Sequence, residues 1–375
     1  MRRLRAGIVG GGQGAFIGAV HRIAAELDGE AQVVAGAMSS NPARARASAE
    51  AWGLARSYDS YEQMAALEAK RDDGIDFAIV ATPNHLHLPV AKAFLEAGTD
   101  VICDKPLAAN LDQAHQLAKA AAASGALFAL THTYSGYPMV REARDWVASG
   151  RLGELRKVQV EYNQDWLREP VERAGNKQAA WRTDPAQAGV SCCVGDIGTH
   201  AHHLVEFITG RQVESILAEL TSFVDGRQLD DDASMLLRLE GGVRGTLACS
   251  QIACGEANDL RIRLYGSKAG LEWRQQEPNA LQVKPAGDAW AIHRVGDDYL
   301  GEAAARATRT PAGHPEGYLE AFANLYRDFM ADVRRVAAGE PALGNYPGIE
   351  DGLRGLRFVQ ASVASSNQGA VWVAL

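Results

Sequence analysis

Two residues that could transfer and hold protons lie one helical turn apart in the stretch GDIGTHAHH (195–203). Asp196 and His200 are four residues apart, and an apolar helix-forming run follows them. Residues at this spacing share one face of a helix, so both side chains could meet one ligand. Histidine titrates near neutral pH and can take a proton from a hydroxyl group, while an aspartate can bind a neighbouring hydroxyl or orient the imidazole. Asp196 could equally be a plain helix N-cap.

The same stretch raises the alternative of a metal site. His200, His202 and His203 cannot all face one point on a regular helix, because adjacent residues diverge by about 100°. The sequence contains no His-Glu-x-x-His motif and no Cys-x-x-Cys pair. We therefore expect no metal, with His202 and His203 lining a pocket or packing, and with Gly195 and Gly198 leaving room for a ligand.

A glycine-rich turn near the N-terminus is typical of a nucleotide-binding site. An apolar run (4–9) breaks into GGGQG (10–14) and then enters AFIGAVHRIAAEL, which has helical spacing. A strand, a glycine turn and a helix in this order bring backbone amides and the helix N-terminus close to a pyrophosphate. The predicted contacts are Gly10, Gly12, Gln13, Gly14, Ala15 and Phe16, and Gly18 is expected to thin the helix where it packs.

The end of the second strand lacks the acidic residue that often binds the adenosine ribose of NAD. Residues 37–41 read AMSSN, so Ser39 and Ser40 are the predicted contacts there. They could bond a ribose hydroxyl of NAD or the 2′-phosphate of NADP. NAD is the expected cofactor, and NADP is left open.

Two further strand ends carry polar residues. ATPNHLH (81–87) ends one strand and CDKP (103–106) ends the next. Ligands of parallel sheets bind at the carboxyl edge, so we expect cofactor contacts from Thr82, Pro83, Asn84, His87, Asp104 and Lys105. Lys105 could also stabilise a substrate oxygen as it becomes an alkoxide. Packing is an equally good interpretation for His87.

The elements needed to position these residues follow from hydrophobic patterning. Buried strand-like runs at 31–38, 76–82, 100–106 and 126–134 alternate with helical segments, which predicts a doubly wound parallel sheet. Beyond residue 151, strand-like runs separated by turns predict a largely antiparallel sheet. Helical patterns return at 317–339 and 348–369.

Composition narrows the class of partner. The chain has 375 residues, 47% of them hydrophobic and 22% charged, with a net charge of −8. This is typical of a globular protein of about two domains, without the basic surface that nucleic acid or an anionic membrane requires. Five cysteines without a C-x-x-C pair favour a reducing, cytoplasmic setting, and no run reaches the ~20 apolar residues of a membrane span. A small molecule is the expected partner.

Aromatic and polar side chains suited to a polyhydroxylated ring lie in TYSGYP, YNQDW and WR. The candidates for substrate contact are Tyr134, Tyr162 and Asp165, in addition to Lys105, Asp196 and His200, and a second pair is Trp181 and Arg182. For any one of these side chains, packing is an equally good interpretation.

Taken in order, GIVGGGQGAFIG, ATPNHLH, CDKP, WRTDP, GDIGTH and the tail DGLRGLRFVQASVAS resemble the Gfo/Idh/MocA family of NAD(P)-dependent sugar and polyol oxidoreductases. The resemblance implies that Lys105, Asp196 and His200 form the catalytic set and that Trp181 and Arg182 lie near the cofactor. It also implies an α/β fold with a Rossmann domain (1–135) and a second domain (136–375) with a large, mostly antiparallel open sheet. The last helix (about 348–367) would return to the first domain, and the open sheet would support a homodimer or homotetramer.

Three functions therefore compete. The leading hypothesis is a dehydrogenase that transfers a hydride between a secondary hydroxyl of a sugar, sugar derivative or cyclitol and a nicotinamide. A redox-elimination glycosidase of the same fold, which uses bound NAD transiently, is the first alternative. A dinucleotide-binding regulator without catalysis is the second, although it would not require Lys105, Asp196 and His200 together.

Overall fold

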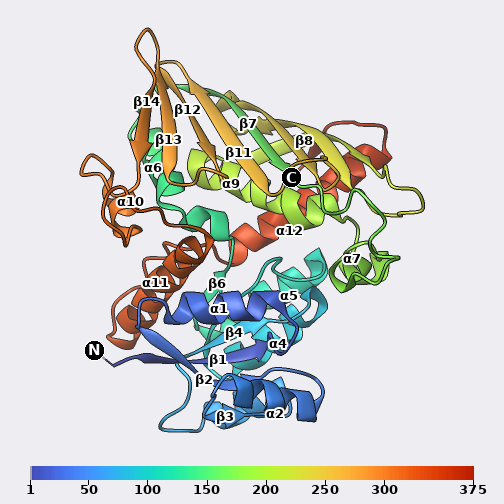
Figure 1. The fold of residues 1–375 in the computed structure, drawn as a ribbon, viewed down its shortest axis with the longest axis vertical. Helices are drawn as coiled ribbons and strands as arrows, with labels where there is room; N and C mark the ends of the chain where they lie inside the picture. The colour runs from blue at the N-terminus through green and yellow to red at the C-terminus, as the bar shows by residue number, and fades with distance from the viewer. Residues whose placement is uncertain (1) are drawn as a thin grey trace. The chain divides into compact units, whose positions relative to one another are not determined.

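The chain folds into two units, each built around its own sheet (Figure 1). The structure is a computed structural model and describes residues 2–375. Unit 1 contains the residues up to Gly136 together with Tyr318–Leu353, and unit 2 contains Tyr137–Gly317 and Arg354–Leu375. The first division thus falls one residue beyond the predicted domain boundary, and the chain returns to unit 1 before it ends in unit 2.

Unit 1 is a six-stranded parallel sheet in the order β3-β2-β1-β4-β5-β6. Its strands are β1 (Leu4–Gly10), β2 (Ala31–Ala37), β3 (Arg56–Ser57), β4 (Phe77–Ala81), β5 (Asp100–Cys103) and β6 (Phe128–Leu130). Its helices are α1 (Phe16–Glu26), α2 (Pro42–Ala51), α3 (Tyr61–Glu68), α4 (His87–Glu96), α5 (Leu111–Ser124) and α11 (Tyr318–Ala337), with short 3₁₀ turns at Asn84–Leu86 and Thr133–Gly136. Because the order reverses between β1 and β4, a crevice for ligands is expected at the carboxyl ends of these strands. This confirms the predicted doubly wound fold.

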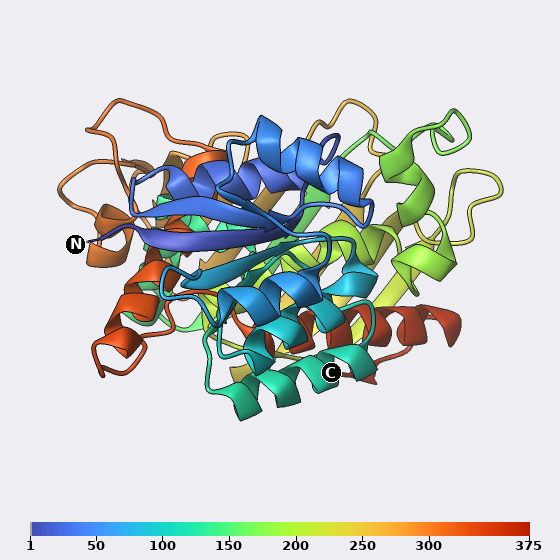
Figure 2. The same cartoon turned by 90° about the horizontal axis from the view of Figure 1, so that it is seen from below.

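Helices cover both faces of the unit 1 sheet, with α1 and α2 on one face and α3, α4 and α5 on the other (Figure 2). The strands are apolar on both faces for this reason, and every residue of β4 is buried. Helix α11 packs against α1 and adds Phe322, Tyr326 and Phe329 to the same core, each at most 1% exposed. A helix from late in the sequence therefore completes the first unit.

Unit 2 contains a nine-stranded sheet in the order β14-β13-β12-β11-β7-β10-β9-β8-β15. The strands are β7 (Leu155–Asn163), β8 (Val213–Thr221), β9 (Asp232–Leu239), β10 (Arg244–Ser250), β11 (Asp259–Gly266), β12 (Ala269–Arg274), β13 (Ala280–Pro285), β14 (Ala291–Arg294) and β15 (Val373–Ala374). Only β7 and β10 pair in parallel; the other neighbours are antiparallel. The sheet confirms the predicted, mostly antiparallel second domain.

The helices of unit 2 lie along one face of this sheet (Figure 1). They include α6 (Pro138–Ala148), α9 (Thr199–Thr209) and the part of α12 (Ile349–Asn367) that follows Leu353. The connecting segments contain α7 (Lys177–Arg182), α8 (Pro185–Ala188), α10 (Glu302–Arg306) and a 3₁₀ turn at Glu240–Gly242. Alternation along β9 and β11 puts Leu237 and Leu264 in the core and leaves Leu236 and Tyr265 46% and 37% exposed. The outer face of the sheet thus carries exposed apolar side chains.

No helix among residues 2–375 combines the length and the apolar character that crossing a membrane requires.

Asp100, at the start of β5, should make the stability of unit 1 depend on pH. Burial, with repulsion from Asp76, outweighs a hydrogen bond from the Leu127 N–H and raises the pKa of Asp100 to about 6. The unfolded-state value is about 4, so between pH 4 and 6 the folded state binds more protons. Asp100 therefore contributes fully to the free energy of unfolding at pH 4, and this contribution, up to about 3 kcal/mol, is lost as the pH rises through 6.

We expect Asp100→Asn, which cannot ionise, to raise the urea midpoint at pH 8 and to leave it nearly unchanged at pH 4. The exposed Asp72 lies in the same unit, and Asp72→Asn is the matched control. Equal midpoints for Asp100→Asn and the unsubstituted protein at pH 8 would contradict this assignment.

Candidate active site

The glycine turn of unit 1 combines very close packing with an open position. A Cβ atom on Gly18 would lie 2.3 Å from the Cα of Gly11, and one on Gly12 would lie 2.6 Å from the carbonyl oxygen of Met38. These two glycines allow α1 and the end of β2 to approach the turn. Gly14 differs, because its φ is +84° and a Cβ there would meet nothing within 4 Å. The turn is therefore tightly packed on the protein side and open at Gly14.

The surroundings of this turn fit a dinucleotide. No side chain caps the N-terminus of α1, so its first N–H groups can bind a pyrophosphate. The buried Oγ1 of Thr82, at the end of β4, has no hydrogen-bond partner among the described residues. At the end of β2, the Ser39 hydroxyl accepts from the N–H of Asn41, whose side chain caps α2. Ser39 and Ser40 thus stand where an acid is often found, and the polar groups of this edge suit NAD.

His87 lies at the same edge but is fully buried. Its Nδ1 is 2.6 Å from the carbonyl oxygen of Pro106, and its Nε2 is 2.9 Å from that of Thr82. Burial lowers the pKa of His87, so the neutral ring donates to one of the two carbonyls. This geometry favours the packing interpretation of His87, as a brace between the ends of β4 and β5, and the neighbouring Asn84 lies in the 3₁₀ turn just before it.

Asp104 holds the segment that carries Lys105. Its Oδ1 accepts from the Lys105 N–H at 3.0 Å and from the Thr131 hydroxyl at 2.9 Å. Burial acts to raise the pKa of Asp104, but the neighbouring His21, Lys105 and His87 outweigh it and lower the pKa to about 2. A partly buried, ionised carboxylate therefore fixes the backbone at Lys105.

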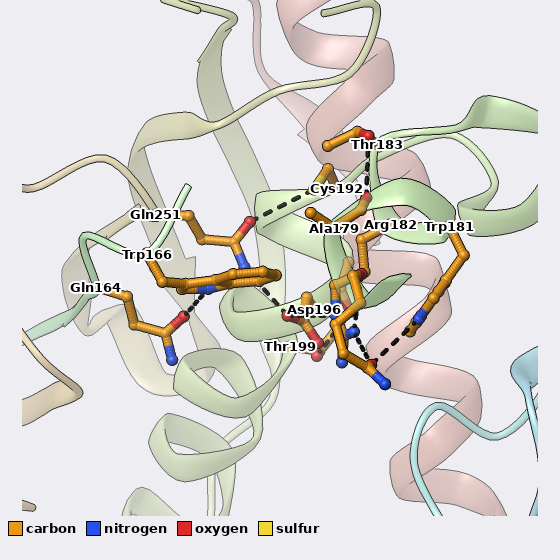
Figure 3. A network of polar contacts seen from close by, with 12 residues as sticks. Gln164, Trp166, Ala179, Trp181, Arg182, Thr183, Cys192, Asp196, Thr199 and Gln251 are labelled. Atoms are coloured by element: carbon orange, nitrogen blue, oxygen red, sulfur yellow. Dashed lines mark hydrogen bonds and ion pairs between the residues drawn. The ribbon is translucent and has the colours of Figure 1, made fainter. Parts of the chain in front are cut away.

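In unit 2, the Asp196 carboxylate is held from two sides (Figure 3). Its Oδ2 accepts from Arg182 Nε and from Gln251 Nε2, both at 3.1 Å. The amide oxygen of Gln251, which is fully buried at the end of β10, in turn accepts from the Cys192 thiol at 3.4 Å. The orientation of the Asp196 carboxylate is thus fixed before any ligand binds.

Arg182 lies between two indole rings. Its guanidinium carbon is 4.2 Å from the ring centre of Trp181 and 5.8 Å from that of Trp166. Its Nη1 donates to the side-chain oxygen of Gln178 at 2.8 Å, and the same oxygen accepts from the Trp181 indole N–H. Cation–π contact and ion pairing together restrict this side chain.

His200 is 8% exposed and faces Tyr162 of β7, with ring centres 6.4 Å apart. The Tyr162 hydroxyl donates to Asn258 at 2.8 Å. The next histidines pack, since His202 stacks on Phe358 at 4.5 Å and His203 stacks on Phe207 at 5.8 Å. His202 and His203 are thus packing residues, one of the two roles expected for them.

A turn of π-helix (Val194–Gly198) carries Asp196 directly into α9, and a buried carboxylate anchors the start of this turn. Asp230 accepts from the Ser191 hydroxyl at 3.0 Å, from the Cys192 N–H at 2.9 Å and from the Val194 N–H at 2.8 Å. Burial outweighs these bonds and raises the pKa of Asp230. π-Turns recur at functional sites, and here the anchor is a residue more than thirty positions later in the sequence.

Four other candidates have different surroundings. Asp165 pairs with Arg168 at 3.1 Å and accepts from the Gly255 N–H. Tyr134 is buried in a 3₁₀ turn of unit 1. A Cβ on Gly198 would lie 3.2 Å from Cys249 Sγ, so this glycine serves packing, not ligand access as expected, whereas the nearest atom to a Cβ on Gly195 is 3.8 Å away.

Sequence reasoning missed the supporting residues Gln251, Asp230, His21 and Asn258. Asp230 lies in the run LDDDAS, and an acidic run that interrupts a strand pattern is a signal that could have been followed. Gln251 directly follows a strand, but its contact with Asp196 has no local signature.

Among the described residues, no group of three or more His, Cys, Asp or Glu side chains is arranged to hold a metal ion. All five cysteines are free, and burial raises the pKa of Cys192 and Cys193. These thiols are therefore packing groups rather than nucleophiles.

These features define an enzyme with a dinucleotide-binding sheet and a second unit that carries acid–base side chains. Models of the Gfo/Idh/MocA family match both: "Oxidoreductase family, NAD-binding Rossmann fold" matches residues 4–132, and "GFO/IDH/MocA C-terminal domain" matches residues 140–272. The chain belongs to the Gfo/Idh/MocA family and is an NAD-dependent oxidoreductase.

Similar proteins extend over nearly the whole chain. The "uncharacterized oxidoreductase YfiI" of Bacillus subtilis (strain 168) is 35% identical over 378 residues, which cover 99% of this chain and 96% of that protein. The crystal structure of an oxidoreductase from Sinorhizobium meliloti is 46% identical, with a TM-score of 0.90 and full coverage of both chains. An inositol dehydrogenase homolog from Azotobacter vinelandii, complexed with NADH and myo-inositol, is 35% identical, with a TM-score of 0.91 over 100% of this chain and 98% of that one.

Removing the anchor of the π-turn should loosen the segment that carries Asp196 and His200. Asp230→Ala leaves the N–H groups of Cys192 and Val194 and the Ser191 hydroxyl without their acceptor, so we expect a loss of about 2–4 kcal/mol in the free energy of unfolding. Hydrogen–deuterium exchange of residues 191–200 should rise at the same time. Asp225→Ala, at an exposed position of the same loop, is the control and should change neither quantity. Unchanged exchange in Asp230→Ala would show that Asp230 is not the anchor.

Proposed function

We propose that this protein is a dehydrogenase that transfers a hydride between NAD and a secondary hydroxyl of a sugar, a sugar derivative or a cyclitol. The observation that carries the proposal is the fixed Asp196 carboxylate, held by Arg182 and Gln251 at 3.1 Å each, one turn before His200. A histidine can take a hydroxyl proton while the fixed carboxylate binds a neighbouring hydroxyl, which supports this chemistry. NADP at the Ser39 and Ser40 edge is the alternative cofactor to test.

Lys105, Asp196 and His200 have separate roles in this proposal. His200 takes the proton from the hydroxyl that is oxidised, and returns it in the reverse direction. Lys105 donates to the same oxygen and stabilises its developing negative charge. Asp196 accepts from a neighbouring hydroxyl and so fixes which carbon faces the cofactor. When bound at the glycine turn, NAD supplies the nicotinamide that accepts the hydride.

The side chains near Asp196 support the proposed substrate class. Trp166 and Trp181 offer aromatic faces, and Tyr162, Asn258 and Gln164 form a polar chain, in which Gln164 donates to Asn258 at 2.6 Å. Aromatic faces with fixed hydrogen-bonding groups suit a ring that carries several hydroxyls. The myo-inositol bound by the similar Azotobacter protein has this chemistry and supports the proposal.

The test of substrate class is a screen of monosaccharides, anhydrosugars, glycosides and inositols with NAD or NADP, followed by absorbance of the reduced nicotinamide. Stoichiometric NADH and a keto product support a dehydrogenase. Sugar release without net NADH would indicate a redox-elimination glycosidase instead, and cofactor binding without any turnover would indicate a regulator.

Substitution of the three side chains tests their roles. We expect Lys105→Ala to lower kcat about 10²–10³-fold and His200→Ala about 10²–10⁴-fold, because each removes an interaction that strengthens in the transition state. NADH affinity, measured by fluorescence titration, should stay within a few-fold. Asp196→Asn should raise KM in addition to lowering kcat, since the Asp196 carboxylate binds a second hydroxyl of the substrate in this proposal.

The control variants for these substitutions are Lys92→Ala and His115→Ala, both at exposed positions of unit 1. Turnover of Lys105→Ala and His200→Ala within a few-fold of these controls would refute the assigned roles.

We also propose that the chain forms a homodimer or homotetramer through the outer face of the unit 2 sheet. The exposed Leu236, Tyr265 and Ile292 support this, because apolar groups on an uncovered sheet face favour association. We expect Leu236→Glu with Ile292→Glu to lower the molar mass measured by light scattering, whereas Val336→Glu in α11 should not. A monomeric unsubstituted protein would contradict the proposal.

A further inference from the structure

His21, a residue of α1 with no assigned role, lies in a buried polar chain that ends at Asp104. His21 is 0% exposed and lies in the middle of α1, the helix that follows the glycine turn. Its Nδ1 is 2.7 Å from the hydroxyl of Tyr326 in α11, and its Nε2 is 3.9 Å from Asp104 Oδ1. Tyr326, His21 and Asp104 therefore connect α11 and α1 to the end of β5, just before Lys105.

Tyr326 and Asp104, at the two ends of this series of polar groups, determine which atoms of His21 donate and accept. Burial raises the pKa of Tyr326 well above its usual value, so the phenol keeps its proton and donates it to His21 Nδ1. The remaining proton of the imidazole is then on Nε2, which faces the ionised Asp104. Packing keeps the ring in this orientation, since Phe322 contacts it edge-on at 4.9 Å.

The His21 Nε2 has no hydrogen-bond partner among the described residues, and its separation from Asp104 Oδ1, 3.9 Å, is longer than a hydrogen bond. A buried polar atom without a partner costs about 1–3 kcal/mol, so the arrangement is not explained by stability. Contacts of this kind often tighten when an active site is loaded.

We propose that His21, oriented by Tyr326, is a positioning residue that holds the Asp104 carboxylate, and through it the backbone of Lys105, in place for the reaction. The inference rests on the proposed role of Lys105. Asp104 accepts from the Lys105 N–H and the Thr131 hydroxyl, so a shift of this carboxylate moves the residue that polarises the substrate oxygen. The other titratable or charged groups that face Asp104 are His87, Lys105, Cys103 and Tyr326.

The test uses His21→Phe, which keeps a ring in the core but removes both nitrogens. We expect kcat to fall at least tenfold with KM and NADH affinity nearly unchanged. The ¹³C signal of the Asp104 carboxyl, assigned with Asp104→Asn, should titrate above pH 4 in this variant, whereas in the unsubstituted protein it should stay ionised to about pH 2. His21→Gln, whose amide can still donate, should restore part of kcat and of the low titration midpoint, and it serves where His21→Phe fails to fold.

Two controls separate a positioning role from simple packing. Tyr326→Phe keeps the aromatic stack but releases the outer hydrogen bond, so it should give a smaller loss in kcat. His115→Phe, on the exposed side of α5, should change nothing. In an Asp104→Asn background, His21→Phe should have little further effect on kcat, because the group on which it acts is no longer charged.

An Asp104 signal that titrates at the same pH with and without His21, or an equal loss of kcat in both backgrounds, would overturn the inference. The NMR titration does not depend on turnover, so it can succeed or fail whatever the substrate is. Failure of the proposed function would instead be seen as full activity in Lys105→Ala.

Discussion

Desolvation of carboxylates is the constraint on which both functional segments depend. Asp104 in unit 1 and Asp230 in unit 2 are each withdrawn from water, and each accepts one or two backbone N–H groups and a hydroxyl at the start of a segment that carries a candidate catalytic residue. Their pKa values shift in opposite directions, because Asp104 has His21 and Lys105 beside it whereas burial dominates at Asp230. Of these two anchors, only Asp104 has Lys105 and the Nε2–H of His21 beside it to favour its ionised form.

Asp196 shows a third solution to the same constraint. Its side chain is 17% exposed, the same fraction as that of Asp104, but it is held by a guanidinium that itself contacts Trp166 and Trp181. A carboxylate pinned by Arg182 and Gln251 needs little reorganisation when it accepts from a substrate hydroxyl, and such preorganisation is the main source of electrostatic catalysis. The same two bonds occupy one oxygen of the carboxylate, which agrees with the proposed role of Asp196 in binding a hydroxyl and with the proposal that His200 is the base.

Local sequence signals predicted the elements well where the pattern was strong. The strand before the glycine turn, the parallel sheet, the change to an antiparallel sheet after residue 151 and the two late helices all follow from hydrophobic periodicity. The π-turn at Val194–Gly198 was not foreseeable, because Asp196 and His200 fit a regular helix equally well in sequence. The anchors were missed for a related reason: Asp230 and His21 act across 38 and 305 residues, and such contacts exist only after the sheets have formed.

Contacts between segments far apart in the sequence also explain why the chain returns to unit 1. The sequence suggested that the last helix would return to the first domain, whereas the structure groups α11 and only the first turn of α12 with unit 1. Phe322, Tyr326 and Phe329 of α11 are buried against β1, β4 and α1, and each aromatic side chain contributes about 1.5–3 kcal/mol when it leaves water. Residues 2–136 alone would leave the side of α1 that packs on α11 exposed, and His21 without Tyr326. The strand end that carries Lys105 is therefore complete only when a segment from beyond unit 2 has packed onto α1, which ties the assembly of the cofactor unit to synthesis of most of the chain.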